Sequence, residues 1–486
     1  MTPQGHFQAP VALMVFEMKN ADLFRHESDY PDFPAERAVG RLSHALTFPT
    51  VSYVDTARVD YGAFARMQAY LRESYPHVAR QGVWEVIGHS LLITLPGRDA
   101  SLPPALFMAH QDVVPVVPGT EANWRHAPFS GDVSEGYIWG RGAMDIKEML
   151  MAELESAEYF LARGAAFRRT VYLAFGEDEE TCSTGAMAIV RTLKERDVRL
   201  AFVLDEGAGD VTDAADWGAP GELICAIGLY EKGYGDLRLK VRSAGGHSSN
   251  PFRGTSLGHL ADAISAIIHN LPAPRLSDSV RYSLRALAPL MTEEPMRGWA
   301  QNPDAHEAEI LNWFLQRESL YHLVRTTAAP TMISGGAPAG NVMPQDMEAV
   351  INFRMIPADT PESLIEHCRS LVGEGVELDW AQQIAASTPS DIDSYGFRAL
   401  KSVLERYFDK LVFIPAQNRG ATDARHYEPL SRCVMRFGPF LEEEAVSAEG
   451  VHGTNERISI RAWLQGVRVL LRLLEETCVK DDIPHE

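Results

Sequence analysis

Two histidines and three acidic residues, spread from the first to the last third of the chain, have side chains that bind transition metals. They fall at the ends of predicted strands and are His110, Asp145, Glu180, Glu206 and His452. Imidazole and carboxylate groups are both good ligands for Zn²⁺, and they leave coordination positions open for water. Because five such ligands suit a pair of divalent cations, the sequence predicts a metal-dependent hydrolase.

His110 has an aspartate two residues further along, in the segment Phe107–Asp112. Residues two apart on an extended backbone point to the same side, so the Asp112 carboxylate can accept the spare imidazole N–H of His110. Such a bond fixes the tautomer and makes His110 a better ligand. Taken alone, however, the pair is also typical of an ordinary surface contact at a strand end.

Two further segments concentrate acids where a cation would fit. Asp145 follows the glycine-containing run Gly140–Met144 at the start of a predicted helix, where aspartate is a common N-cap. A carboxylate there can also bridge two cations roughly 3.5–4 Å apart. The four acids at Glu177–Glu180 follow a predicted strand. Such runs are often solvated and favoured by the next helix N-terminus, but a metal would relieve their mutual repulsion.

The elements that must position these residues alternate between strands and helices. From about residue 85 to 206, short apolar runs predict strands, and a periodicity of roughly 3.6 residues predicts helices. We expect strands at Leu91–Leu95, Ala105–Ala109, Thr170–Phe175 and Leu200–Leu204, and helices at Ile146–Leu161 and Ala186–Lys194. This alternation predicts an α/β unit with a mostly parallel sheet, in which ligands bind at the carboxyl ends of the strands.

The pattern changes after Lys232 and changes back near residue 384. Residues 233–383 predict an inserted α+β domain with an antiparallel sheet, and residues 1–232 and 384–486 predict the two parts of the α/β domain. Within the insertion we expect strands at Asp236–Val241, Ala349–Phe353 and Val376–Trp380, helices at Leu257–Leu271 and Pro361–Leu371, and a polar, irregular stretch over 281–327. In the last part we expect a helix at Gly396–Tyr407, a strand at Val434–Gly438 and a helix at Ile458–Thr477.

Composition excludes several classes of partner and location. The chain has 486 residues, of which 45% are hydrophobic, and this is enough for two cores. Its 45 basic and 66 acidic side chains leave a net charge of −21, which argues against nucleic acid. The five cysteines show neither metal-finger nor disulfide spacing, so we expect reduced thiols in a cytoplasm. The early apolar run Val11–Phe16 is too short for a membrane anchor and lacks the basic region of a signal peptide.

These segments resemble the dinuclear-zinc peptidase family that includes carboxypeptidase S, bacterial glutamate carboxypeptidase, succinyl-diaminopimelate desuccinylase and aminoacylase. The resemblance runs from Ala35 and Leu46–Ser52 to the C-terminal helix, and the stretch near 281–335 is most similar to the carboxypeptidase S branch. The most specific segments are His110–Val116, Trp124–Lys147, Asp178–Glu180 and Gly450–Glu456. The chain departs from the family pattern at Ile146 and at Thr181–Ser183. These departures remove no ligand, and we expect them to alter the shape of the pocket or the metal preference.

The resemblance implies two Zn²⁺ ions per chain, with Co²⁺ or Mn²⁺ as substitutes. It implies that Glu179 is the general base, that Asp112 orients His110, and that either Asp205 or Glu206 reaches the metal, with Glu206 preferred. The implied ligands are His110 and Glu206 for one ion, Glu180 and His452 for the other, and Asp145 as the bridge.

The resemblance also assigns roles within the inserted domain. It makes His247, in Gly245–Ser249, a donor to the oxyanion, supplied in many relatives by the lid of a partner subunit; the alternative is a turn histidine. Asn341 and Gly420 are expected near the substrate. Arg354 ends a predicted strand, and its planar guanidinium suits a substrate carboxylate or, alternatively, an edge-strand salt bridge.

The function expected is therefore zinc-dependent hydrolysis of an amide bond in a short peptide or an N-acyl amino acid, with release of an amino acid. The alternative is an N-acyl-amino-acid amidohydrolase without preference for peptides. Small-molecule substrates and a homodimer through the inserted lid domain are the expected partners. A metal-free scaffold is disfavoured because neither a ligand nor Glu179 is lost. A nucleophilic serine enzyme is disfavoured because no Gly-x-Ser-x-Gly elbow is predicted at a strand-to-helix turn.

Overall fold

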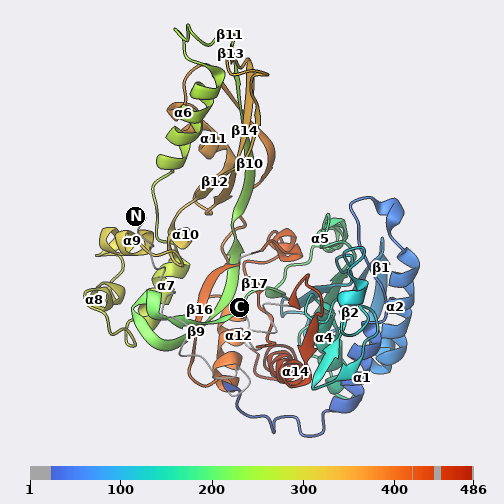
Figure 1. Cartoon of the computed structure of the whole chain (residues 1–486). Coiled ribbons are helices and arrows are strands. Elements are labelled where there is room, and N and C mark those ends of the chain that lie inside the picture. Colours follow the sequence, from blue (N-terminus) through green and yellow to red (C-terminus); the bar gives the residue numbers. More distant parts are fainter. Residues whose placement is uncertain (1–22, 419, 443–449, 484–486) are drawn as a thin grey trace, which may run out of the picture.

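The computed structural model describes residues 23–418, 420–442 and 450–483, and a nine-stranded sheet is at its centre (Figure 1). The strands run in the order β1-β2-β6-β3-β7-β17-β9-β16, and β8 pairs with β9. Their bounds are Val83–Ile87 (β1), Ser90–Leu95 (β2), Val171–Gly176 (β6), Ala105–His110 (β3), Phe202–Asp205 (β7), Val434–Arg436 (β17), Ala219–Glu231 (β9), Leu411–Asn418 (β16) and Val211–Ala214 (β8). Strands β6, β3, β7 and β17 are parallel, with antiparallel pairs beside them. The predicted α/β class with a parallel centre is confirmed.

Helices cover both faces of this sheet because successive side chains of a strand point to opposite faces. In β6, Leu173 and Phe175 pack in the larger core cluster, whereas Tyr172 and Ala174 pack in a cluster on the other face. The larger cluster contains residues of α1 (Ala35–Ala45), α2 (Tyr61–Ser74), α4 (Lys147–Ala162), α12 (Tyr395–Tyr407) and α14 (Ile460–Leu474), and the smaller one contains residues of α5 (Thr184–Glu195). The result is a three-layer arrangement.

A second unit, which we call the lid, projects from the first (Figure 1). Its antiparallel sheet has the order β12-β14-β10-β15, and two helices pack on it. The bounds are Thr327–Gly335 (β12), Asp346–Met355 (β14), Gly233–Arg242 (β10), Val376–Ile384 (β15), Ser256–His269 (α6) and Pro361–Leu371 (α11). At its tip, β11 (Gly246–His247) pairs with β13 (Val342–Met343). The antiparallel sheet expected for the insertion is present.

The prediction of irregular structure over 281–327 is wrong. Four short helices occupy most of this stretch: α7 (Asp278–Leu287), α8 (Met296–Gln301), α9 (Glu307–Leu315) and α10 (Tyr321–Val324). Ser277 caps α7, and Leu284 and Leu287 are fully buried one turn apart on its inner face. These helices pack with Ile224 of β9 and Ile414 of β16. By these contacts, the helices α7–α10 adjoin the nine-stranded sheet.

Four strands of the nine-stranded sheet, β1, β8, β9 and β16, have no counterpart among the predicted elements. A small sheet of β4 (Val133–Ser134), β5 (Tyr137–Trp139) and β18 (Arg457–Ser459) lies before α14, which therefore begins later than expected. Among the helices in the described ranges, none is both long and apolar enough to cross a bilayer.

Candidate metal centre

Acidic side chains and an imidazole lie together at the carboxyl ends of three parallel strands of the central sheet. His110 is the last residue of β3, Glu179 and Glu180 follow β6, and Glu206 follows β7. Parallel neighbours end at the same edge of a sheet, and this is why residues far apart in the sequence meet there. Asp145 reaches the same place from the turn before α4, and His452 from a turn before β18.

The ligand atoms of these residues form two groups that share Asp145, and we call them the metal groups. One group is His110, Asp145 and Glu206, the other is Asp145, Glu180 and His452, and within each group the atoms lie within 4.8 Å of one another. The two oxygens of Asp145 diverge: Oδ1 is 3.0 Å from His110 Nε2, and Oδ2 is 3.0 Å from His452 Nε2. His110 Nε2 also lies 3.3 Å from Glu206, and His452 Nε2 lies 3.1 Å from Glu180. A carboxylate so placed can serve two cations at once.

The electrostatics of the two groups fit divalent cations. Burial raises the pKa of Glu206 to about 8, and the charge of Asp145 adds to the effect. Burial likewise raises the pKa of Glu179, and Glu206 raises it further. Hydrogen bonds to Asp145 and Glu180 raise the pKa of His452 to about 10. Carboxylate oxygens are hard donors and imidazole nitrogens are borderline donors. Crowded, buried carboxylates beside two imidazoles therefore suit Zn²⁺ and similar ions.

Asp112 fixes two parts of the centre at once. His110 Nδ1 donates to the Asp112 backbone carbonyl at 2.9 Å and lies 3.3 Å from its carboxylate, so Nε2 faces the metal groups. The Asp112 carboxylate accepts the hydroxyl of Ser52 at 2.6 Å and the backbone N–H groups of Glu179 and Glu180 at 3.2 Å. The expected carboxylate contact is thus shared with a carbonyl, and Asp112 also holds the turn that carries both glutamates. Ser52 was not anticipated, because an isolated serine has no spacing signal.

Glu179 lies beside the two groups without being a member of either. Its Oε2 is 4.0 Å from His110 Nε2, and its side chain is largely buried. Asp205 points elsewhere, since its Oδ2 accepts the backbone N–H of Ala424 at 3.0 Å. Of the two acids that the sequence left open at this strand end, Glu206 is therefore the one whose oxygen faces His110.

The residues expected in the lid lie apart from this cluster. His247 is exposed in β11, with Nδ1 2.8 Å from the hydroxyl of Ser249, and Asn341 accepts the N–H of Ser248 at 3.0 Å through its carbonyl. Both belong to the tip of the lid, at the end remote from the nine-stranded sheet (Figure 1). Within one chain, the structure does not bring His247 or Asn341 to the metal groups.

Arg354 and Gly420 lie closer to where the two units meet. Arg354 is exposed on β14 and stacks on the ring of Tyr234, with 4.7 Å between the guanidinium carbon and the ring centroid. Burial lowers the pKa of Lys232 to about 8, and the charge of Arg354 lowers it further, so the two cations are neighbours at the root of the lid. Gly420 is exposed, and its carbonyl accepts from Asn418 at 3.1 Å.

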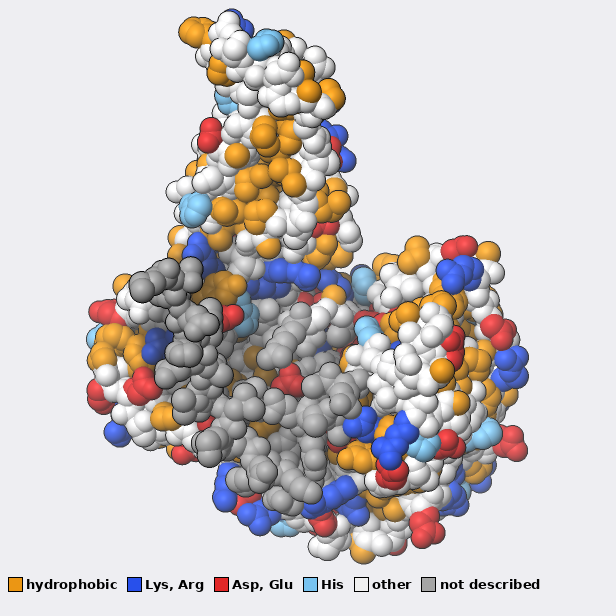
Figure 2. Space-filling view, viewed as in Figure 1, with side chains coloured by type: hydrophobic (Ala, Val, Ile, Leu, Met, Phe, Trp, Pro, Cys, Tyr) orange, Lys and Arg blue, Asp and Glu red, His pale blue; other side chains and the backbone are white. Residues whose placement is uncertain are grey.

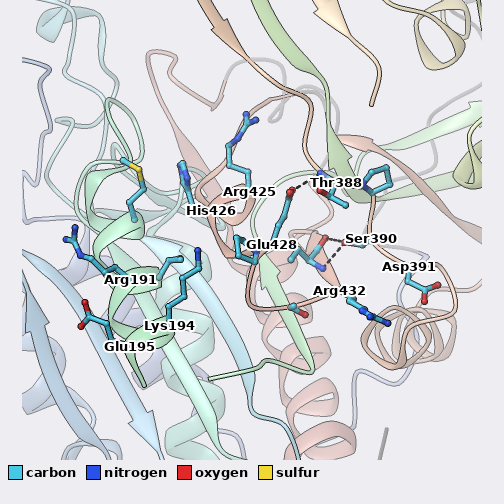
Figure 3. A pocket seen from close by; sticks show the side chains of 16 residues that line it. Arg191, Lys194, Glu195, Thr388, Ser390, Asp391, Arg425, His426, Glu428 and Arg432 are labelled. Carbon is cyan, nitrogen blue, oxygen red and sulfur yellow. Dashed lines mark hydrogen bonds between the residues drawn. The ribbon is translucent and has the colours of Figure 1, made fainter. Parts of the chain in front are cut away.

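A cavity of about 940 Å³ opens between α5, residues 388–391 and residues 425–434 (Figure 3). Arg191, Lys194 and Arg432 lie on its lining together with His426. No member of the two metal groups lines it, although the segment Asp423–Tyr427 contributes both to this cavity and to the contact with Asp205. This cavity is therefore separate from the metal centre.

Comparisons with known proteins agree with this geometry. A profile described as peptidase family M20/M25/M40 matches residues 106–476. The chain is 33% identical to a probable carboxypeptidase S-like 2 of Dictyostelium discoideum over 447 residues, 90% of this chain and 84% of that protein. It is 32% identical to human N-fatty-acyl-amino acid synthase/hydrolase PM20D1, over 89% of this chain and 86% of that protein.

Solved structures show the same fold at low identity. The M20 family metallo-carboxypeptidase Sso-CP2 from Sulfolobus solfataricus superimposes with a TM-score of 0.58 at 19% identity, covering 90% of this chain and 98% of that one. Human carnosine dipeptidase 1 superimposes with a TM-score of 0.57 at 15% identity, covering 91% and 96%.

Proposed function

This chain belongs to the peptidase family M20/M25/M40, as the sequence resemblance predicted, and is an amide hydrolase; from that premise we propose a dinuclear zinc enzyme of the carboxypeptidase S type. Its substrate is a short peptide or an N-acyl amino acid, from which it releases an amino acid with a free carboxylate. The observation that carries the proposal is Asp145, whose two oxygens face two different histidines.

The residues of the two groups hold the ions, with His110 and Glu206 on one side of Asp145 and Glu180 and His452 on the other. A pair of divalent cations bound there would polarise the scissile carbonyl and lower the pKa of a water molecule. Mn²⁺ or Co²⁺ ions are expected to substitute for Zn²⁺ at the same ligands.

Glu179 moves the proton in the proposed reaction. Its side chain lies 4.0 Å from His110 and belongs to neither group, so it can accept a proton from the attacking water and then donate it to the leaving nitrogen. The backbone bonds from Glu179 and Glu180 to Asp112 hold the base and the neighbouring ligand in a fixed relation. This pre-positioning contributes to the rate enhancement, because the reacting groups need no reorganisation.

The lid binds and orients the substrate. Arg354 pairs with the carboxylate of the released amino acid, and Asn341 and Gly420 contact the substrate. His247 stabilises the oxyanion in the site of a second copy of the chain, because the tip of its own lid lies away from its own metal groups (Figure 1).

This arrangement requires a homodimer, and we propose that it forms through the lid. Edge strand β12 exposes Met332 at 66% and Ile333 at 63%, and Figure 2 shows apolar side chains over the lid above a band of basic ones at its root. We propose a cytoplasmic location as well, because all five cysteines are free thiols.

A second candidate activity is hydrolysis of N-acyl amino acids without preference for peptides. The 32% identity to the synthase/hydrolase PM20D1 favours it. The two candidates share the metal centre and differ only in the group on the acyl side of the scissile bond.

The test is release of free amino acid from matched panels of dipeptides, N-acetyl and N-long-chain-acyl amino acids, each with and without a chelator. Chelation should abolish release, and added Zn²⁺, Co²⁺ or Mn²⁺ should restore it. Dipeptides used as well as acyl amino acids would support the first candidate, and exclusive use of acyl amino acids the second. Full activity in protein shown by elemental analysis to lack transition metals would refute both.

A further inference from the structure

His452 is the one member of the two metal groups that neither follows a central strand nor precedes α4. It lies on a turn before β18 with a left-handed φ of 59°, and its side chain is 52% exposed. This turn belongs to no strand of the nine-stranded sheet. Another contact must therefore place His452 next to Asp145 and Glu180.

Arg141 and Glu456 make that contact from two segments 315 residues apart. Arg141 Nη1 donates to Glu456 Oε2 at 2.5 Å, and Arg141 Nη2 donates to the carbonyl of His452 itself at 3.3 Å. The second oxygen of Glu456 accepts the backbone N–H of Met144 at 2.9 Å, and the Glu456 carbonyl accepts from Gly140 at 3.0 Å. Met144 directly precedes Asp145.

Together, these four hydrogen bonds connect Met144, which precedes the ligand Asp145, with the backbone of the ligand His452. Both side chains of the pair are shielded from water, with 3% of Arg141 and none of Glu456 exposed. The backbone is equally constrained: Gly142 has a φ of 85°, and a Cβ there would lie 2.7 Å from Val113. The turn with Asp145 and the turn with His452 are thus packed as one unit.

A buried ion pair of this kind is weak evidence for stability. Desolvation of the two charges offsets their attraction, and an apolar pair of similar volume is often as stable or more so. What the pair specifies is geometry, because its planar guanidinium and carboxylate make three directed contacts that an apolar pair cannot make.

We propose that Arg141 and Glu456 are positioning residues that set the affinity of the group Asp145–Glu180–His452 for its cation. The inference rests on the proposed function, since it presupposes two bound ions. It assigns the pair no contact with the substrate. Residues that orient metal ligands through hydrogen bonds typically change metal affinity by about 10–100-fold when replaced.

The experiment uses a double variant, Arg141→Met with Glu456→Met, because removing only one partner would leave a buried charge and could unfold the chain. Metal-free protein is titrated with Zn²⁺ against a chelating dye, and its thermal unfolding is recorded in parallel. The parent should bind two ions. The double variant should remain folded and bind one ion within about threefold of the parent affinity and the other about 10–100-fold more weakly.

A milder variant, Arg141→Lys, keeps the charge and loses the forked contact to His452. If the double variant does not fold, Arg141→Lys should show the same selective loss of affinity for one ion. The matched control is Glu155→Gln, which breaks the buried pair of Arg41 and Glu155 (3.1 Å) in the same unit but touches no metal group. The control should lower the unfolding temperature and leave both affinities unchanged.

Folded pair variants that keep both parent affinities would overturn the inference, as would equal weakening of both ions or the same selective loss in the control. A parent that binds fewer than two ions would instead overturn the dinuclear function and the inference with it. The two failures are therefore distinguishable.

Discussion

At the scale of single residues, the adjacent glutamates Glu179 and Glu180 differ in their surroundings. Glu180 belongs to a metal group and Glu179 does not, although both are held by Asp112 through adjacent backbone N–H groups. In the proposed reaction, a ligand and a proton carrier thus follow each other directly after β6. Their side chains have the same chemistry, so their different surroundings must produce different roles.

Glu179→Gln should lower kcat by about 10²–10⁴-fold, because it removes the group that transfers the proton and keeps its volume. Its metal content should equal that of the parent. Glu180→Gln serves as the comparison and should lose metal, as measured by elemental analysis of dialysed protein. If the two variants behaved in the reverse way, the assignment of base and ligand would be reversed.

Arg354 tests the class of substrate. A charge-assisted pair with the substrate carboxylate contributes on the order of 1.5–3 kcal/mol, and lysine cannot reproduce the forked geometry. Arg354→Lys should therefore lower kcat/KM about 10–150-fold for substrates with a free carboxylate. Amidated analogues should be poor substrates of the parent and nearly indifferent to the change. Equal turnover of free and blocked substrates by the parent would show that Arg354 only stacks on Tyr234.

At the scale of elements, the strands that carry the chemistry could be predicted, because buried parallel strands read as short apolar runs followed directly by acids. Strand β16 was missed because Pro415 interrupts it; a proline is tolerated there since β16 is the edge of the sheet. The helices over 278–324 were missed because each is short and surrounded by polar residues. The contact of Arg141 with Glu456 could not be found at all, because local spacing contains no information about pairs so distant in sequence.

The short helices should nonetheless be part of the folded core. Leu284 of α7 is fully buried among the side chains that join α7–α10 to β9 and β16, so Leu284→Ala should destabilise the chain by about 2–5 kcal/mol. Leu257→Ala on α6, where the side chain is 46% exposed, is the matched control and should change stability by less than about 0.5 kcal/mol. Chemical denaturation of the metal-free proteins measures both. Equal, small effects would contradict the packing of α7 on the sheet.

At the scale of the whole molecule, the proposed site needs a residue that one chain does not bring to it. The metal groups lie at the edge of the nine-stranded sheet, whereas His247 lies at the far tip of the lid (Figure 1). A second copy that supplies its lid would complete the site. Dimerisation would then be a requirement of catalysis and not only of stability.

Mixed dimers test this arrangement. A His247→Ala chain and a Glu179→Gln chain should each be nearly inactive, and heterodimers of the two should regain up to about half of the activity per site, because one of the two sites then has both residues intact. Differently tagged chains, purified as heterodimers, allow the measurement. No recovery in proven heterodimers would mean that His247 acts in the site of its own chain, or that it only stabilises the turn in which it lies.

The central claim is that Asp145 bridges two cations, and anomalous X-ray scattering from crystals grown with Zn²⁺ tests it most directly. Data collected on both sides of the zinc edge should show two peaks roughly 3.5–4 Å apart. One should lie against His110 and Glu206, the other against Glu180 and His452, with Asp145 between them. A single peak, or two peaks without Asp145 between them, would contradict the account.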